Sequence, residues 1–254
     1  MNTELKKSLL TYCLRLADTS HILGQRLAEW CGHGPVLEED IAMTNISLDH
    51  IGQARAFYTY AGELEANGKS EDDYAYLRDA RDYYNLLIAE QPNGDFGKTM
   101  LRQFFISTFQ YYLYTELCHS SNKTIAALAE KSLKEVTYHV RHSQDWIIRL
   151  GDGTSESKQR LMDALDDLWL YTEDMFDIDE VDNQLLKAGI GADIKKIKSL
   201  WDSKVAEVLS LATLDIPQNS FMIKGSREGK HSEHLGYILA EMQVLQRMYP
   251  GVTW

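Results

Sequence analysis

The chain has 254 residues, 38 of them acidic and 26 basic, and a formal net charge of -12 at pH 7. This acidic balance argues against a nucleic-acid binder and against a protein held on anionic lipid, because both need a basic face. No uninterrupted apolar run approaches the roughly 18–20 residues of a membrane span. The three cysteines, Cys13, Cys31 and Cys118, lie far apart. They are typical of free thiols, so we expect a cytoplasmic protein.

The composition and the hydrophobic periodicity predict an all-α fold. Leucine, alanine, glutamate, lysine and glutamine are plentiful and valine is scarce, which favours helix over strand. The periodicity predicts helices over 3–31, 37–66, 72–89, 97–120, 123–150, 156–176, 194–214 and 232–248. The first, second, fourth and fifth are long, and two long pairs joined by a crossover are the pattern of a ferritin-like four-helix bundle. We expect one domain over 1–254, with its bundle core at 3–150 and accessory helices at 155–254.

Five polar residues fall within the apolar sectors of two predicted helices. At about 100° per residue, Asn45, Asp49 and Gln53 share the sector of the second helix that contains Ile41 and Leu48. In the fifth helix His139 lies at the centre of the apolar sector, and Glu135 lies one turn before it. A buried carboxylate or imidazole is costly unless it is paired. We therefore expect Asn45, Asp49, Gln53, Glu135 and His139 to face one another as a buried polar cluster.

The alternative is a carboxylate-bridged di-iron centre, which takes a Glu from each of two helices and a Glu-x-x-His pair from each of two others. Neither helix supplies such a pair. Asp49 is followed at the third position by Gly52, and Glu135 by Tyr138, with His139 one residue late. The sequence favours the polar cluster, with no metal or catalytic residue in this chain. A catalytic subunit that uses Asp49, Glu135 and His139 as ligands is the alternative.

Histidines elsewhere give weaker signals for metal. Glu116 and His119 match the Glu-x-x-His spacing at the very end of the fourth helix. Glu228 and His231 match the same spacing in a glycine-rich loop. His231 also precedes His234 by three residues at the start of the last helix. A metal there is conceivable, but polar residues on a solvated first turn are the commoner case.

Two segments are candidates for contact with a partner. The fourth helix has almost no polar face, and a helix that is apolar all round is buried in a core or between subunits. Its candidate interface residues are Phe104, Phe105, Phe109, Tyr111 and Tyr112. Core packing accounts for them equally well. The stretch Pro217 to Lys230 is a flexible connector or a loop that contacts a partner or coenzyme A, through Lys224, Arg227 and Lys230.

Five stretches carry a family resemblance. They are Leu14 to Gly34, Asn45 to Arg55 (NISLDHIGQAR), Leu86 to Phe96 (LLIAEQPNGDF), Lys134 to Gly151 and the C-terminal HSEHLGYILAEMQVLQRMYPGVTW. Together they reach from one end of the chain to the other. The chain resembles the C subunits of bacterial phenylacetyl-CoA epoxidases, which are multicomponent ring monooxygenases of aerobic phenylacetate breakdown.

The resemblance implies a ferritin-like subunit that has lost its iron ligands and pairs with the catalytic A subunit. It also implies a small B subunit and a reductase that binds transiently. Iron would be held by the A subunit, and flavin and an iron–sulfur cluster by the NADPH-dependent reductase. We therefore expect a non-catalytic structural subunit without a cofactor of its own. The alternatives are the catalytic di-iron subunit above and an acyl-CoA-binding module, and homodimerisation of the isolated chain stays open.

Overall fold

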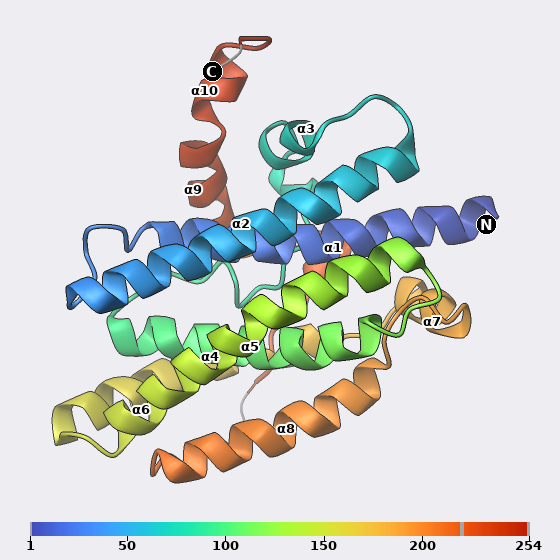
Figure 1. Cartoon of the computed structure of the whole chain (residues 1–254). Coiled ribbons are helices and arrows are strands. Elements are labelled where there is room, and N and C mark those ends of the chain that lie inside the picture. Colours follow the sequence, from blue (N-terminus) through green and yellow to red (C-terminus); the bar gives the residue numbers. More distant parts are fainter. Residues whose placement is uncertain (1, 219–220, 253–254) are drawn as a thin grey trace. The chain divides into compact units, whose positions relative to one another are not determined.

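The structure is a computed structural model that describes residues 2–218 and 221–252 (Figure 1). Over these residues it contains ten α-helices, three short 3-10 helices and no strand, so the all-α prediction is confirmed. None of the helices within this range has the length and apolarity that crossing a bilayer requires. The chain divides into two compact units. We call residues 1–92 with 225–254 the terminal unit and residues 93–224 the central unit. That the two form one domain with its core at 3–150 stays a prediction.

The terminal unit is built on a hairpin of two long helices, α1 (Thr3–Ala28) and α2 (Leu37–Glu65), which lie side by side (Figure 1). The side chain of Asn2 caps the start of α1 by accepting from the backbone N–H of Leu5 at 2.7 Å. Gly24 allows the two helices to approach closely. A Cβ atom there would lie 3.0 Å from Cδ1 of Ile51, and the Ser47 hydroxyl donates to the Gly24 carbonyl at 2.8 Å.

The prediction of a helix over 72–89 is wrong beyond the first turns of that range. Helix α3 covers Glu71–Tyr76, a 3-10 turn covers Ala80–Asp82, and turns and irregular backbone follow. Short turns hold part of this stretch, and other backbone groups in it bond to distant side chains. The N–H of Tyr84 donates to Oδ2 of Asp18 at 2.8 Å, and the Leu86 N–H donates to the Thr19 hydroxyl at 3.2 Å. Tertiary hydrogen bonds have thus replaced the helical ones that local propensity favours.

The C-terminal segment follows a 3-10 turn at Ser226–Glu228 and is also more broken than predicted. Helix α9 (Glu233–Met242) and helix α10 (Val244–Met248) replace the single helix expected over 232–248. They separate at Gln243, whose side-chain amide donates to the carbonyl of Arg78 at 3.0 Å and to the Tyr83 hydroxyl at 3.2 Å. This buried amide attaches the C-terminal helices to the loop that follows α3.

The central unit is built on a second hairpin, α4 (Phe96–Leu117) and α5 (Lys123–Gly151). Asp95 and Asn122 cap the two helices through their side chains. Helices α6 (Ser155–Trp169) and α8 (Ile194–Leu211) pack against α4 and α5. The helix predicted over 156–176 ends at Trp169 and is followed by a 3-10 stretch at Thr172–Phe176. Helix α7 (Glu180–Lys187) is an element that the periodicity does not predict.

The aromatic residues of α4 form the core of the central unit. Phe104 and Phe105 are fully buried, and Phe109 is 5% exposed. The ring of Phe105 lies 5.5 Å from that of Trp201, whose indole N–H donates to the Phe105 carbonyl at 2.9 Å. The prediction that these three phenylalanines form a partner interface is therefore wrong, because partners within the same unit bury them. Tyr111 and Tyr112 are half-buried and stay candidates.

Candidate functional site

Helix α2 buries a different face from the predicted one. Gln53 is buried as expected, with 2% exposed, and Asp49 is half-buried, but Asn45 is exposed. Leu48 is 62% exposed, although its spacing places it in the apolar sector. His50, which the spacing does not mark as a core residue, is fully buried. Apolar residues lie on several sides of α2, so their spacing alone defines the buried face poorly. The burial of Asn45 is a wrong prediction.

The polar residues of helix α5 agree more closely with their predicted burial than those of α2 do. His139 is fully buried and Glu135 is half-buried. Tyr138, at the position where an i, i+3 ligand would stand, is 40% exposed. Because α2 belongs to the terminal unit and α5 to the central unit, mutual contact among the five polar residues stays a prediction.

Neither α2 nor α5 carries a carboxylate followed three residues later by a histidine, the pair that a di-iron centre needs. Across residues 2–218 and 221–252, no three or more His, Cys, Asp or Glu side chains are grouped so that they could hold a metal ion. The literal motif matches have other partners. Glu116 forms an ion pair with Lys196 at 2.6 Å, and Glu228 forms one with Lys230.

A buried carboxylate organises the terminal unit. Asp18 in α1 has no exposed surface and accepts hydrogen bonds from the Tyr58 hydroxyl at 2.6 Å and from Nη1 of Arg78 at 3.2 Å. The same guanidinium lies 4.2 Å from the centre of the Tyr83 ring. Burial alone would lower the pKa of Arg78, but the charge of Asp18 outweighs burial and raises it. The contacts of Asp18 with Tyr58 and Arg78 therefore join α1, α2 and the loop after α3.

His21 extends this network. Burial is the main reason that its pKa falls to about 4, so the imidazole is neutral near pH 7. The Tyr58 hydroxyl donates to Asp18, and it can accept from Nδ1 of His21 at 3.4 Å. With Nδ1 as the donor, Nε2 keeps its lone pair. His21 lines a cavity of about 290 Å³ together with residues that include Arg55 and Tyr76.

A second buried carboxylate holds the C-terminal segment. Glu90 has no exposed surface, and its Oε2 lies 2.9 Å from Nδ1 of His231. The backbone N–H of Ser232 donates to its Oε1 at 2.6 Å, and the Asn85 amide donates to Oε2 at 2.9 Å. The interpretation of His231 as a residue of a solvated turn is therefore wrong. Both segments, EQPNG and HSEH, are distinctive in the sequence, but neither pattern indicates the contact that joins them.

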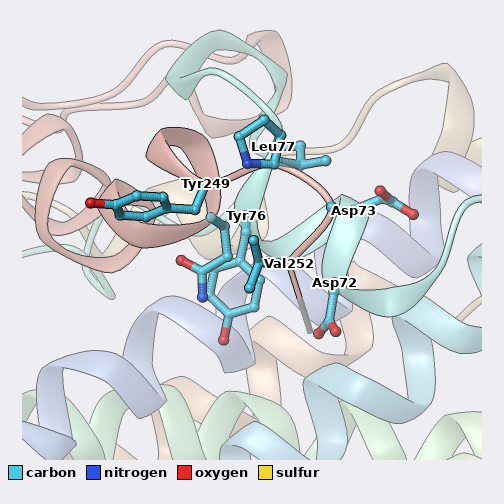
Figure 2. Close-up of a pocket in the computed structure, with 9 residues that line it drawn as sticks. Asp72, Asp73, Tyr76, Leu77, Tyr249 and Val252 are labelled. Atoms are coloured by element: carbon cyan, nitrogen blue, oxygen red, sulfur yellow. The ribbon is translucent and has the colours of Figure 1, made fainter. Parts of the chain in front are cut away.

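A further cavity of about 290 Å³ lies between α3 and the C-terminal segment of the terminal unit (Figure 2). Figure 2 shows Asp72, Asp73, Tyr76 and Tyr249 around it. The carboxylate of Asp73 is already engaged, because it accepts from the backbone N–H of Ser70 at 2.7 Å as part of a capping box.

Two of the three basic residues of the predicted contact loop already form ion pairs within the chain. Lys224 lies 3.4 Å from a carboxylate oxygen of Asp177, and Lys230 pairs with Glu228. Arg227 is half-buried. Since carboxylates already engage both lysines, the loop offers less charge to an acyl-CoA phosphate than its sequence indicates. Its contact with a partner or with coenzyme A stays a prediction.

Comparison with known proteins agrees with the resemblance found in the motifs. The chain is 46% identical over 246 residues to an Escherichia coli (strain K12) protein, the C subunit of 1,2-phenylacetyl-CoA epoxidase. The match covers 97% of this chain and 99% of that protein. A family model described as "Phenylacetic acid catabolic protein" matches residues 1–254, and the family is ferritin-like. The two long helix pairs of the structure are the elements that such a fold uses. The chain therefore belongs to the phenylacetic acid catabolic protein family.

Proposed function

We propose that the chain is a non-catalytic structural subunit of a phenylacetyl-CoA epoxidase complex. In this proposal it pairs with the catalytic A subunit and stabilises it, alongside a small B subunit. Iron is held by the A subunit, and flavin and an iron–sulfur cluster are held by a reductase that binds transiently. The similarity to the C subunit of such an epoxidase over nearly the whole chain supports the assignment to this kind of complex.

The ligand positions of α2 and α5 are the observation that carries the non-catalytic part of the proposal. A di-iron bundle needs an imidazole three residues after a carboxylate on two helices. Gly52 supplies no ligand atom at that position of α2, and Tyr138 at that position of α5 is 40% exposed. His139 is buried but stands one residue late.

The physical role of such a subunit is to hold its partner's helices in place. Metal ligands work only when their helices are fixed to within a fraction of an ångström, which requires a rigid supporting surface. The buried pair of Asp18 with Arg78 attaches the irregular segment after α3 to α1, and the pair of Glu90 with His231 attaches the C-terminal segment to that irregular segment. A terminal unit tied in this way suits a scaffold.

Co-expression tests the proposal. The catalytic A subunit is produced with and without this chain, and both preparations are assayed for soluble yield, iron content and epoxidation of phenylacetyl-CoA with the reductase supplied. We expect the A subunit alone to be poorly active and the pair to be active. Replacing His139 with Gln should reduce activity only as far as it reduces assembly. An A subunit that is fully active alone, or turnover by this chain alone, would contradict the proposal.

A further inference from the structure

The chain contains two Asn-Gly dipeptides, Asn67-Gly68 in the terminal unit and Asn93-Gly94 in the central unit. An asparagine followed by glycine is prone to ring closure, because glycine has no side chain to shield its amide nitrogen from the carbonyl carbon of the asparagine side chain. Closure in a folded chain depends on how firmly the surroundings hold these two groups apart. The two dipeptides differ in this respect.

Asn67 and Gly68 lie at the tip of the short loop between α2 and α3. Both residues are exposed, and the φ of Gly68 is +85°. A Cβ atom at Gly68 would have no other atom within 4 Å, so the space around the dipeptide is open. The N–H of Gly68 makes no hydrogen bond within the described residues. No backbone contact therefore has to break before this nitrogen can react.

The side chain of Asn67 is already folded over the amide that would attack it. Its Oδ1 accepts from the backbone N–H of Lys69 at 3.1 Å. Such an Asx turn closes a ring across the intervening peptide, so the side-chain carbonyl lies beside the Gly68 nitrogen. The other contact of this side chain is a hydrogen bond to the nearby Glu65 carboxylate. Both contacts are local, and neither fixes the loop to a distant element.

Asn93 is held by helix α4 at two points. Its Oδ1 accepts from the guanidinium of Arg102, a residue that is 1% exposed. Its backbone carbonyl accepts from the Thr99 hydroxyl at 2.9 Å. Turning the side chain onto the Gly94 nitrogen would break a hydrogen bond from a buried charged group, which is costly.

We propose that Asn67 is a site of spontaneous deamidation in the folded chain and that Asn93 is protected by α4. The backbone nitrogen of Gly68 attacks Cγ of Asn67, and a new N–Cγ bond forms as the bond from Cγ to Nδ2 breaks. The proton of the Gly68 N–H leaves with the side-chain nitrogen as ammonia. Water then opens the succinimide at either carbonyl and gives aspartate or isoaspartate. The reaction does not depend on the proposed structural role.

The product changes the contacts of the loop between α2 and α3. A carboxylate at position 67 cannot donate to Glu65, and the two like charges repel each other. The Glu65 carboxylate also accepts from Nζ of Lys69 at 3.1 Å and from the Tyr74 hydroxyl of α3. We therefore expect deamidation to weaken the attachment of α3 to the end of α2.

Peptide mapping by mass spectrometry tests the site on the full-length chain after ageing in mildly alkaline buffer. We expect aspartate and isoaspartate to form at Asn67 faster than at Asn93 by about tenfold or more, since Asn93 must first break its bond to Arg102. The same chain unfolded in urea is the matched control. There the two dipeptides should react at similar rates, because the contacts of α4 are lost.

Two substitutions give a second readout. Asn67→Gln, whose longer side chain closes the ring poorly, should stop the reaction at this position and leave Asn93 unchanged. Asn67→Asp should elute with the deamidated chain on anion exchange and unfold at lower urea concentration than Asn67→Gln. Equal rates at Asn67 and Asn93 in the folded chain would overturn the proposal. So would an intact Asn67 after the unfolded control has reacted, or a difference between the sites that persists in urea.

Equal stability of the two Asn67 variants would contradict the expected effect on the attachment of α3.

Discussion

The imidazole of His231 lies between two acceptors, with Nδ1 2.9 Å from Oε2 of Glu90 and Nε2 2.8 Å from the carbonyl of Tyr83. A neutral imidazole carries one N–H and would leave one of these contacts without a proton. The imidazolium has two N–H groups and satisfies both contacts. Protonated His231 thus holds the C-terminal segment to the Glu90 carboxylate of the same unit.

Replacing His231 with Ala should lower the free energy of unfolding by about 3 kcal/mol, because the fully buried Glu90 carboxylate loses its cation. Urea unfolding followed by circular dichroism measures the change. His234→Ala is the matched control, since His234 is half-buried three residues away and makes no ion pair within the described residues. Equal losses in the two variants would show that the pair with Glu90 is not the cause.

The same pair gives a pH dependence with a defined sign. Burial alone would lower the pKa of His231, but the hydrogen bond and charge of Glu90 raise it above its ordinary 6.5. A raised pKa in the folded state gives stability that is fully present below about pH 6.5 and is lost as pH rises through the folded value. The difference in unfolding free energy between the parent chain and His231→Ala should therefore shrink in alkaline buffer. A difference that grows with pH would contradict this assignment.

His21 should change the free energy of unfolding in the acid range, and its contribution should depend on pH with the opposite sign to that of His231. Its pKa is lowered to about 4 by burial, so the folded state resists protonation while the unfolded state takes up a proton near pH 6.5. Its contribution is intact above pH 6.5 and is lost as pH falls towards 4, by about 3 kcal/mol at 1.36 kcal/mol per pH unit. His21→Gln should flatten this part of the unfolding profile. An unchanged acid profile in the variant would refute the assignment.

Asp18→Asn should destabilise the chain by about 3–5 kcal/mol, because it leaves the Arg78 guanidinium buried without its anion. The side chain of Arg78 is 13% exposed and that of Asp18 is fully buried. Asp79→Asn is the control, since Asp79 pairs with Arg247 at the surface and is 79% exposed. Exposed pairs contribute at most about 1 kcal/mol. Comparable losses in the two variants, measured by urea unfolding, would contradict the buried-pair account.

Phe105→Ala distinguishes a core residue from an interface residue. Removing a buried phenylalanine costs about 3–5 kcal/mol, so the isolated chain should unfold at clearly lower urea concentration. Leu211→Ala, at a position that is 55% exposed at the end of α8, should have little effect. If Phe105→Ala kept full stability and lost only its association with a partner, Phe105 would be an interface residue after all.

The long helices were predictable because their signals are local. Asn2, Asp95 and Asn122 cap their helices within three residues, and α1, α2, α4 and α5 begin and end within three residues of the predicted positions. The segment after α3 was not predictable, because its hydrogen bonds join groups far apart in the chain. Arg78 reaches Asp18 across 60 positions.

The candidate site was predictable only in part. The burial of Gln53 and His139 followed from helical spacing, whereas Asn45 was placed on the wrong face of α2. The contact between Glu90 and His231 spans 141 positions, so no local pattern indicates it. The two segments that contain these residues were nevertheless among the most distinctive motifs of the sequence.

Iron analysis of the purified full-length chain, produced with iron supplied, tests the central claim most directly. Neither α2 nor α5 carries a carboxylate followed three residues later by a histidine, so we expect iron well below one equivalent per chain. Glu135→Ala should leave that value unchanged. About two irons per chain in the parent protein, lost on substitution of Glu135 or His139, would contradict the non-catalytic assignment.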